Sequence, residues 1–152
     1  MVKRTYPESP RVGVGALVIH EHKVLLVKRG VAPSEGLWAV PGGSLELGET
    51  LQAGAERETF EETGVTVQAR KPVYTFDYIE RDDDDHGSIR FHFVIVDLWA
   101  DYVSGEPVGR DDALEARWVG KEGIKTLPLG ENTLKLLKFV HFLDQHSPVG
   151  MP

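Results

Sequence analysis

The feature that most constrains this chain is a run of 23 residues, 43–65, that reads GSLELGETLQAGAERETFEETGV. Glu58, Glu61 and Glu62 fall on one side of the short helix that this run predicts, and Glu49 lies just ahead of it. Clustered like charges destabilise a helix by about 0.2–0.5 kcal/mol per pair. A divalent cation bound at these carboxylates would offset that cost, and a phosphate substrate would accompany the cation.

The predicted helix extends from about Thr50 to Thr63. Thr50 is a residue type that accepts a hydrogen bond at a helix N-cap, and Gly64 is the type that commonly follows a helix end. With about 100° of rotation per residue, four side chains fall within roughly 60° of one another. They are Leu51, Ala55, Glu58 and Glu62.

The face of this helix therefore begins apolar and becomes acidic halfway along, with Glu61 at its flank. A surface helix keeps its carboxylates opposite the apolar stripe, so this pattern directs them toward the protein or into a cleft. Hard oxygen ligands of this kind suit Mg²⁺ or Mn²⁺. The alternative interpretation is a solvated acidic helix end.

Composition limits the other classes of protein. A chain of 152 residues predicts one domain over residues 1–152, with residues 1–10 as a loose arm. The sequence lacks cysteine, an apolar signal segment and any run of about 18 apolar residues, so we expect a cytoplasmic location and no membrane association. The net charge of −7 argues against polymeric nucleic acid as a partner, whereas a small anion remains compatible if a metal supplies positive charge.

Periodicity predicts strands and two helices, an order typical of an α+β fold or an α/β/α sandwich. The first two strands form a predicted hairpin, and residues 30–48 form a loop rich in Gly and Pro. The predicted strands are 11–20, 23–28, 65–69, 73–79, 89–100 and 116–120. Residues 131–144 carry apolar side chains at helical spacing and predict an amphipathic closing helix.

The run 43–65 resembles the box of the Nudix hydrolases, G-x5-E-x7-R-E-U-x-E-E-x-G-U, where U is an apolar residue. Every charged and glycine position matches: Gly43, Glu49, Arg57, Glu58, Glu61, Glu62 and Gly64. The single departure is Thr59 at the first U position, where side chains pack rather than react. LVKRG and GLWAVPGG ahead of the helix, and GEP…DDALEARWV after it, extend the resemblance to about residues 12–119.

The resemblance implies an α/β/α sandwich around a mixed sheet and hydrolysis of nucleoside diphosphates linked to another group. It implies that Glu58 and Glu62 are the main metal ligands and Glu61 a third, with Mg²⁺ as the metal and Mn²⁺ as a substitute. The carbonyl of Gly42 or Gly43 would be a further ligand.

Other residues would support or complete the site. Arg57 and Glu49 would pair to hold the loop shape, alongside Gly43 and Gly64. The general base varies within the family, so it would be a box glutamate or an acid on a later loop, where Asp112 stands.

Two further residues are candidate substrate contacts. Arg29 follows the second strand and could reach a phosphate, or it could be a solvated strand-end arginine. Trp38 could stack on a base, as could Tyr74, Phe76 or Tyr78, although such residues are more often core.

The box indicates the reaction type rather than the substrate. The array SQPWPFPxS is absent, and Glu80 stands where some ADP-ribose hydrolases carry a proline. The compact chain still looks most like small ADP-ribose pyrophosphatases. The alternative is a nucleoside triphosphate pyrophosphohydrolase, including one acting on 8-oxo-dGTP, and the non-enzyme alternative is a nucleotide-binding sensor. Many relatives are dimers, so a homodimer through an exposed strand or the arm is compatible with the resemblance.

Overall fold

Two long strands lie parallel in the middle of the fold, β1 (Arg11–His20) and β6 (Ile89–Ser104). The computed structural model describes residues 4–83 and 86–144. The strand β5 (Thr66–Arg81) pairs antiparallel with β6, and β2 (Lys23–Arg29) forms a hairpin with β1. Three further strands complete the mixed sheet: β3 (Trp38–Ala39) and β7 (Ala113–Gly120) pair with β2, and β4 (Gly42–Ser44) pairs with β1.

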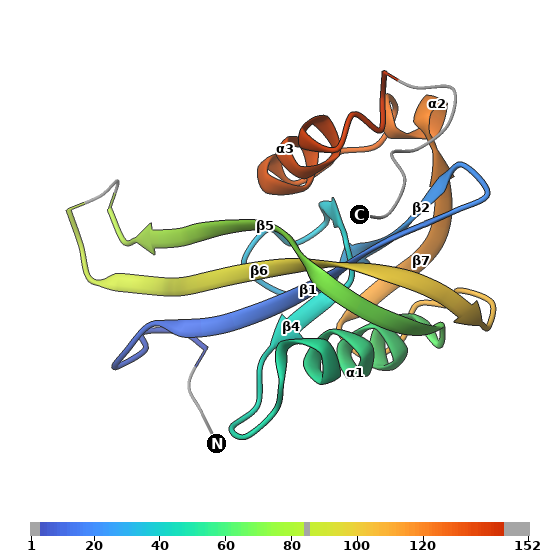
Figure 1. The fold of residues 1–152 in the computed structure, drawn as a ribbon. Helices are drawn as coiled ribbons and strands as arrows, with labels where there is room; N and C mark the ends of the chain where they lie inside the picture. The colour runs from blue at the N-terminus through green and yellow to red at the C-terminus, as the bar shows by residue number, and fades with distance from the viewer. Residues whose placement is uncertain (1–3, 84–85, 145–152) are drawn as a thin grey trace.

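Helices cover both faces of this sheet, as Figure 1 shows. The helix α1 (Leu51–Thr63) lies on one side, and α2 (Lys121–Ile124) and α3 (Glu131–Phe139) lie on the other. The predicted α+β fold, an α/β/α sandwich around a mixed sheet, is therefore confirmed. Among the described residues, no helix combines the length and apolar character that a membrane crossing requires.

Local signals at both ends of α1 explain its position. The Thr50 hydroxyl accepts a hydrogen bond from the Ala53 amide at 3.0 Å, which satisfies one of the free amide groups of the first turn. Gly64 has φ 74°, a left-handed conformation that costs glycine little, and its amide closes the helix on the Phe60 carbonyl. Thr59, the departure from the family pattern, is fully buried and donates its hydroxyl to the Ala55 carbonyl at 2.7 Å.

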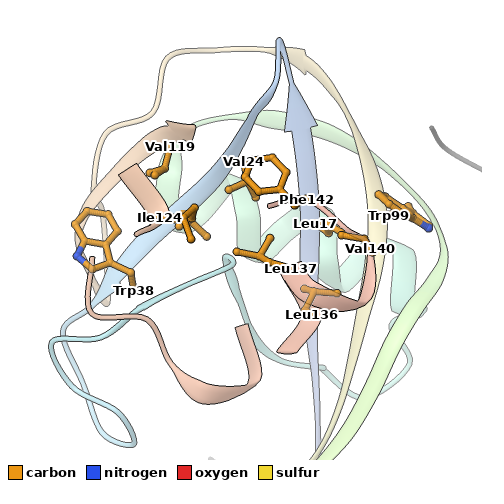
Figure 2. Packing of buried hydrophobic residues seen from close by; sticks show 11 residues of the cluster. Leu17, Val24, Trp38, Trp99, Val119, Ile124, Leu136, Leu137, Val140 and Phe142 are labelled. Carbon is orange, nitrogen blue, oxygen red and sulfur yellow. The ribbon is translucent and has the colours of Figure 1, made fainter. Parts of the chain in front are cut away.

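Each face of the sheet carries its own apolar cluster. Val14, Val18 and Leu98 pack in one cluster with Ala55 of α1. On the opposite face the cluster includes residues from the sheet, from α2 and from α3, as Figure 2 shows. Its labelled members are Leu17, Val24, Trp38, Trp99, Val119, Ile124, Leu136, Leu137, Val140 and Phe142. This second cluster anchors α3 above the sheet.

Several predicted strand boundaries are wrong. The two strands predicted at 65–69 and 73–79 form the single strand β5, whose pairing with β6 is irregular around Pro72. Because β5 is an edge strand, the missing amide of Pro72 does not end it. Strand β6 extends to Ser104, β7 begins at Ala113, and the predicted loop 30–48 contains β3 and β4.

The closing helix is shorter than its apolar spacing predicts, because α3 ends at Phe139. His141 adopts φ 58°, and the Phe142 amide donates to the Leu137 carbonyl at 2.9 Å. This turn reverses the chain so that Phe142, at 3% exposure, enters the core. The sequence reasoning also missed the short helix α2.

The N-terminal arm is tied to the fold within its described part. Residues 4–10 form no helix or strand, but the Tyr6 amide donates to the Arg90 carbonyl at 2.8 Å. The Tyr6 hydroxyl lies 3.0 Å from both carboxylate oxygens of Asp82. Residues 1–3 lie outside the described residues, and the single-domain interpretation of 1–152 stays a prediction.

Replacing Leu136 with Ala should lower the free energy of unfolding by about 2–5 kcal/mol, because this fully buried side chain joins α3 to the core. Urea denaturation at pH 7 would measure the change. The matched control is Lys138→Ala, an exposed position on the same helix, which should change stability by less than about 0.5 kcal/mol. Equal effects of the two substitutions would contradict the packing described here.

Candidate active site

The side chain of Arg57 holds the loop ahead of α1 against the helix. Its guanidinium makes two hydrogen bonds to the Glu49 carboxylate, at 2.7 and 2.9 Å, and a third to the Ser44 carbonyl at 3.0 Å. Glu49 also accepts a hydrogen bond from the Glu46 amide. Pairing with Arg57 lowers the pKa of Glu49. Two-pronged pairing of this kind fixes orientation as well as distance, so the loop conformation is set by one side chain.

The same guanidinium also contacts the acidic part of α1. Its Nη1 atom lies 2.9 Å from Glu58 Oε1 and 2.9 Å from Glu61 Oε1. The Glu58 carboxyl lies against the backbone of Gly43, where a Cβ atom would collide with it. Burial raises the pKa of Glu58, while Arg57 opposes that shift. A side chain at Gly43 would therefore displace the Glu58 carboxyl.

Glu62 is the most deeply placed carboxylate of the helix, with 7% of the residue exposed. Its Oε1 atom accepts a hydrogen bond from the Gly42 amide at 2.9 Å, which joins α1 to β4. Burial raises the pKa of Glu62 to about 8, and the Gly42 hydrogen bond only partly opposes that shift. A desolvated carboxylate gains more from a nearby cation than a solvated one does.

A cavity of about 610 Å³ opens beside these groups. Glu58 and Glu62 line it, as do Arg29 from the end of β2 and Asp112 from the loop ahead of β7. Ligand cavities commonly measure about 300–1,000 Å³, so this one is large enough for a nucleotide. The structure thus brings together the acidic end of α1, the predicted phosphate-binding arginine and the predicted later acid.

Arg29 is held by backbone oxygens rather than by a carboxylate. Its Nε atom donates to the Pro33 carbonyl at 2.6 Å and its Nη2 atom donates to the Val31 carbonyl at 3.4 Å. Burial lowers the pKa of the guanidinium, although an arginine stays charged at neutral pH. The result is an oriented positive charge on the cavity wall.

Asp112 lies at the more open part of the cavity, with a side chain that is 58% exposed and 3.6 Å from the Arg4 guanidinium. Its carbonyl accepts the Gly30 amide at 2.8 Å, which ties its loop to the end of β2. This placement is compatible with the predicted role of an acid on a later loop, and that role stays a prediction.

Two predicted site residues lie away from the cavity lining. Glu61 points to Arg57 with a side chain that is 44% exposed. Trp38 is 2% exposed and belongs to the core cluster, where the Arg117 guanidinium covers its ring at 4.4 Å from the centroid. The neighbours Leu37 and Ala39 line the cavity instead. Phe76 and Tyr78, weighed with Trp38 as stacking residues, do line it.

One cavity residue escaped the sequence reasoning. Asp97 lies on β6 within the apolar run FVIVDLWA and is 4% exposed, yet it lines the cavity. Burial alone raises the pKa of its carboxyl to about 7. The signal available in the sequence was a single carboxylate inside a strand that is otherwise apolar. Aspartate is rarely buried in a protein unless its carboxyl has a partner.

The donor set suits a hard divalent cation. Two desolvated carboxylates, Glu58 and Glu62, border the same cavity, and the backbone of the Gly42–Gly43 segment lies against both of them. Oxygen ligands of this type are those that Mg²⁺ and Mn²⁺ prefer. In the described part of the chain, no three Asp, Glu or His side chains converge closely enough to form a complete metal site by themselves. Glu58 and Glu62 would therefore hold a cation with help from backbone oxygens or water.

The buried carboxyl of Asp97 predicts a pH dependence of stability. Its pKa of about 7 is above its unfolded value, so folding is favoured while it is protonated and the benefit is lost as pH rises through 7. Between pH 5 and pH 8, wild type should lose about 2–3 kcal/mol of unfolding free energy relative to Asp97→Asn. Denaturant titrations of both proteins across this range would measure it, with Asp101→Asn on the same strand as control. Parallel pH profiles for wild type and Asp97→Asn would contradict the burial of an uncompensated acid.

Comparisons with known proteins agree with this geometry. The NUDIX domain model matches residues 9–139. Over 109 residues the chain is 33% identical to an ADP-ribose pyrophosphatase from Methanocaldococcus jannaschii, and the aligned segment covers 72% of this chain and 61% of that protein. The chain thus spans less than two thirds of that relative's length.

Two crystal structures share the fold at 28% sequence identity. The NUDIX hydrolase from Nitrosomonas europaea superposes with a TM-score of 0.73, covering 95% of this chain and 77% of the other. A bifunctional NMN adenylyltransferase/ADP ribose pyrophosphatase from Francisella tularensis, complexed with AMP and a manganese ion, superposes with a TM-score of 0.65, covering 88% of this chain and 41% of the other. With the family model matching most of the chain, and with Gly43, Glu58 and Glu62 of the box lining a cavity, the chain belongs to the Nudix hydrolase family.

Proposed function

We propose that this protein hydrolyses a phosphoanhydride bond in a small nucleotide, with ADP-ribose or a similar nucleoside diphosphate derivative as the favoured substrate. The observation that supports it most is the placement of Glu58, Glu62 and Arg29 around one cavity of nucleotide size. Carboxylates for a metal and a fixed arginine are the groups that a diphosphate needs nearby.

The residues of the chain divide the work as follows. Glu58 and Glu62 would hold Mg²⁺ or Mn²⁺, which when bound neutralises phosphate oxygens and acidifies water. Arg29 binds the phosphate groups from the same part of the cavity as Glu62, because its side chain is already oriented by two backbone carbonyls. The general base is a box glutamate or Asp112. Arg57 and Glu49 position the loop and do not touch the substrate.

The substrate preference is supported by two relatives. The Methanocaldococcus jannaschii protein is named for ADP-ribose, and the Francisella tularensis enzyme carries both AMP and manganese. The second candidate is a nucleoside triphosphate pyrophosphohydrolase. It is supported by structural similarity to a MutT NUDIX hydrolase from Burkholderia pseudomallei, and the superposed region covers 99% of that protein. The two candidates share the acidic end of α1 and differ in the group attached to the nucleotide.

Purified protein with Mg²⁺ should convert ADP-ribose to AMP and ribose 5-phosphate, with slower turnover of 8-oxo-dGTP and ordinary dNTPs. Chromatography of the products from each compound separates the two candidates, because a triphosphate pyrophosphohydrolase releases pyrophosphate and a monophosphate. Activity should disappear with EDTA and return with Mg²⁺ or Mn²⁺ in excess. Full turnover in EDTA would contradict the role given to Glu58 and Glu62.

Glu62→Gln should reduce kcat/KM by about 10²–10⁴ while leaving the fold intact. The amide of Gln keeps an oxygen for the Gly42 hydrogen bond and removes a desolvated charge, so stability should be unchanged or higher. The matched control is Glu56→Gln on the same helix, whose side chain bonds the Ala69 amide away from the cavity. It should retain wild-type kcat/KM.

Steady-state kinetics and thermal unfolding of both variants give the result. Wild-type rates in Glu62→Gln would contradict the proposal. A wild-type protein that binds nucleotides but hydrolyses none of them would support the sensor alternative.

A further inference from the structure

Asp97 is buried without a compensating group. It is 4% exposed, and within residues 4–83 and 86–144 neither a hydrogen-bond donor nor a positive charge pairs with its carboxyl. Among the described residues no fully buried polar side-chain atom lacks a hydrogen-bond partner, so the unpaired Asp97 carboxyl reaches the cavity. Its partial desolvation still costs free energy, which a donor supplied from outside the chain would offset.

The backbone of β1 leaves this carboxyl open to the cavity. Gly15 lies opposite Asp97 in the parallel pair of β1 and β6, and a Cβ atom on Gly15 would collide with Asp97 Oδ1. Two residues earlier, a Cβ on Gly13 would lie 2.6 Å from Ile95 Cδ1. The sheet therefore forms a floor of the cavity to which Gly13 and Gly15 of β1 contribute no side chain, and Asp97 is the acidic residue of this floor.

Flat apolar side chains stand beside Asp97 on the same face of the sheet. In the register of β5 and β6, Phe76 pairs with Ile95 and Tyr78 pairs with Phe93, and all four line the cavity. Aromatic and aliphatic surfaces of this kind suit a planar base, because they can stack on any base whatever polar groups it carries. Selection among bases must then come from a polar group.

Several charged groups of the cavity gather around Glu62. Glu58, Arg29 and Asp112 all act electrostatically on Glu62, whereas burial alone shifts the pKa of Asp97. The phosphate groups of a nucleotide belong at the end that holds Arg29 and the metal-binding carboxylates, since an anion beside Asp97 would meet repulsion. The base is then the part of the ligand left for the apolar floor.

We propose that Asp97 determines specificity by accepting a hydrogen bond from an amino group on the base of the bound nucleotide. Adenine and guanine carry such a group, and uracil does not. This inference rests on the proposed function only in taking a nucleotide as the ligand. Asp97 contacts the base and takes no part in hydrolysis.

The test is equilibrium binding of three monophosphates in the presence of Mg²⁺, measured by calorimetry: AMP, GMP and the unsubstituted purine ribonucleoside monophosphate, which lacks amino and oxo groups. Wild type should bind AMP or GMP at least about tenfold more tightly than the unsubstituted purine nucleotide. In Asp97→Ala that ratio should fall to about one. Asp97→Leu gives the same comparison if the alanine variant does not fold.

Asp101→Ala is the matched control, a partly exposed aspartate on the same strand that pairs with Arg70 and is not part of the cavity lining, and it should keep the wild-type ratios. A wild-type ratio near one for both AMP and GMP would overturn the inference, as would an equal loss of affinity for all three nucleotides in Asp97→Ala, which a purely structural residue would produce. Failure to bind any of the three would overturn it as well. Because no hydrolysis is measured, selective binding by a protein that hydrolyses nothing would refute the proposed function and leave this inference standing.

Discussion

The site depends on a single guanidinium. Arg57 ties the loop that carries Glu49 to the helix that carries Glu58, and its bond to the Ser44 carbonyl also fixes the end of β4. Glu62 in turn needs β4 in place, because its partner is the Gly42 amide. The carboxylates can therefore lie close together, which their mutual repulsion opposes, only because one cation on the chain and one strand edge hold the surrounding backbone.

Stability and activity make opposite demands on this cavity. Glu62 and Asp97 are both desolvated, and burial raises the pKa of each carboxyl above its usual range. Selection for stability alone would favour apolar side chains of similar size at both positions, even though Glu62 accepts a hydrogen bond from the Gly42 amide. Their presence in one cavity fits a ligand that brings a cation and phosphates to one of them and a hydrogen-bond donor to the other.

Local signals account for the part of the fold that could be predicted. The ends of α1 follow from Thr50 and Gly64, and the box places the acidic face of the helix before any tertiary contact is known. Three features that the sequence pattern did not predict depend on non-local contacts. Trp38 packs in the core because of its place in the sheet. Helix α3 ends early because the turn at His141 brings Phe142 into the core. Asp97 lines the cavity because of the register of β6 against β1. No window of sequence around Asp97 contains that register.

The depth of the cavity comes from side chains that are missing. On β1, Gly13 and Gly15 leave the space above them to Ile95 Cδ1 and the Asp97 carboxylate, and a methyl group at either glycine would displace that side chain. The floor can therefore be raised in small steps without altering Glu58, Glu62 or Arg29. A single alanine on β1 could therefore narrow the range of ligands while leaving the metal-binding carboxylates unchanged. These two glycines are the positions at which evolution or engineering could change the choice of nucleotide.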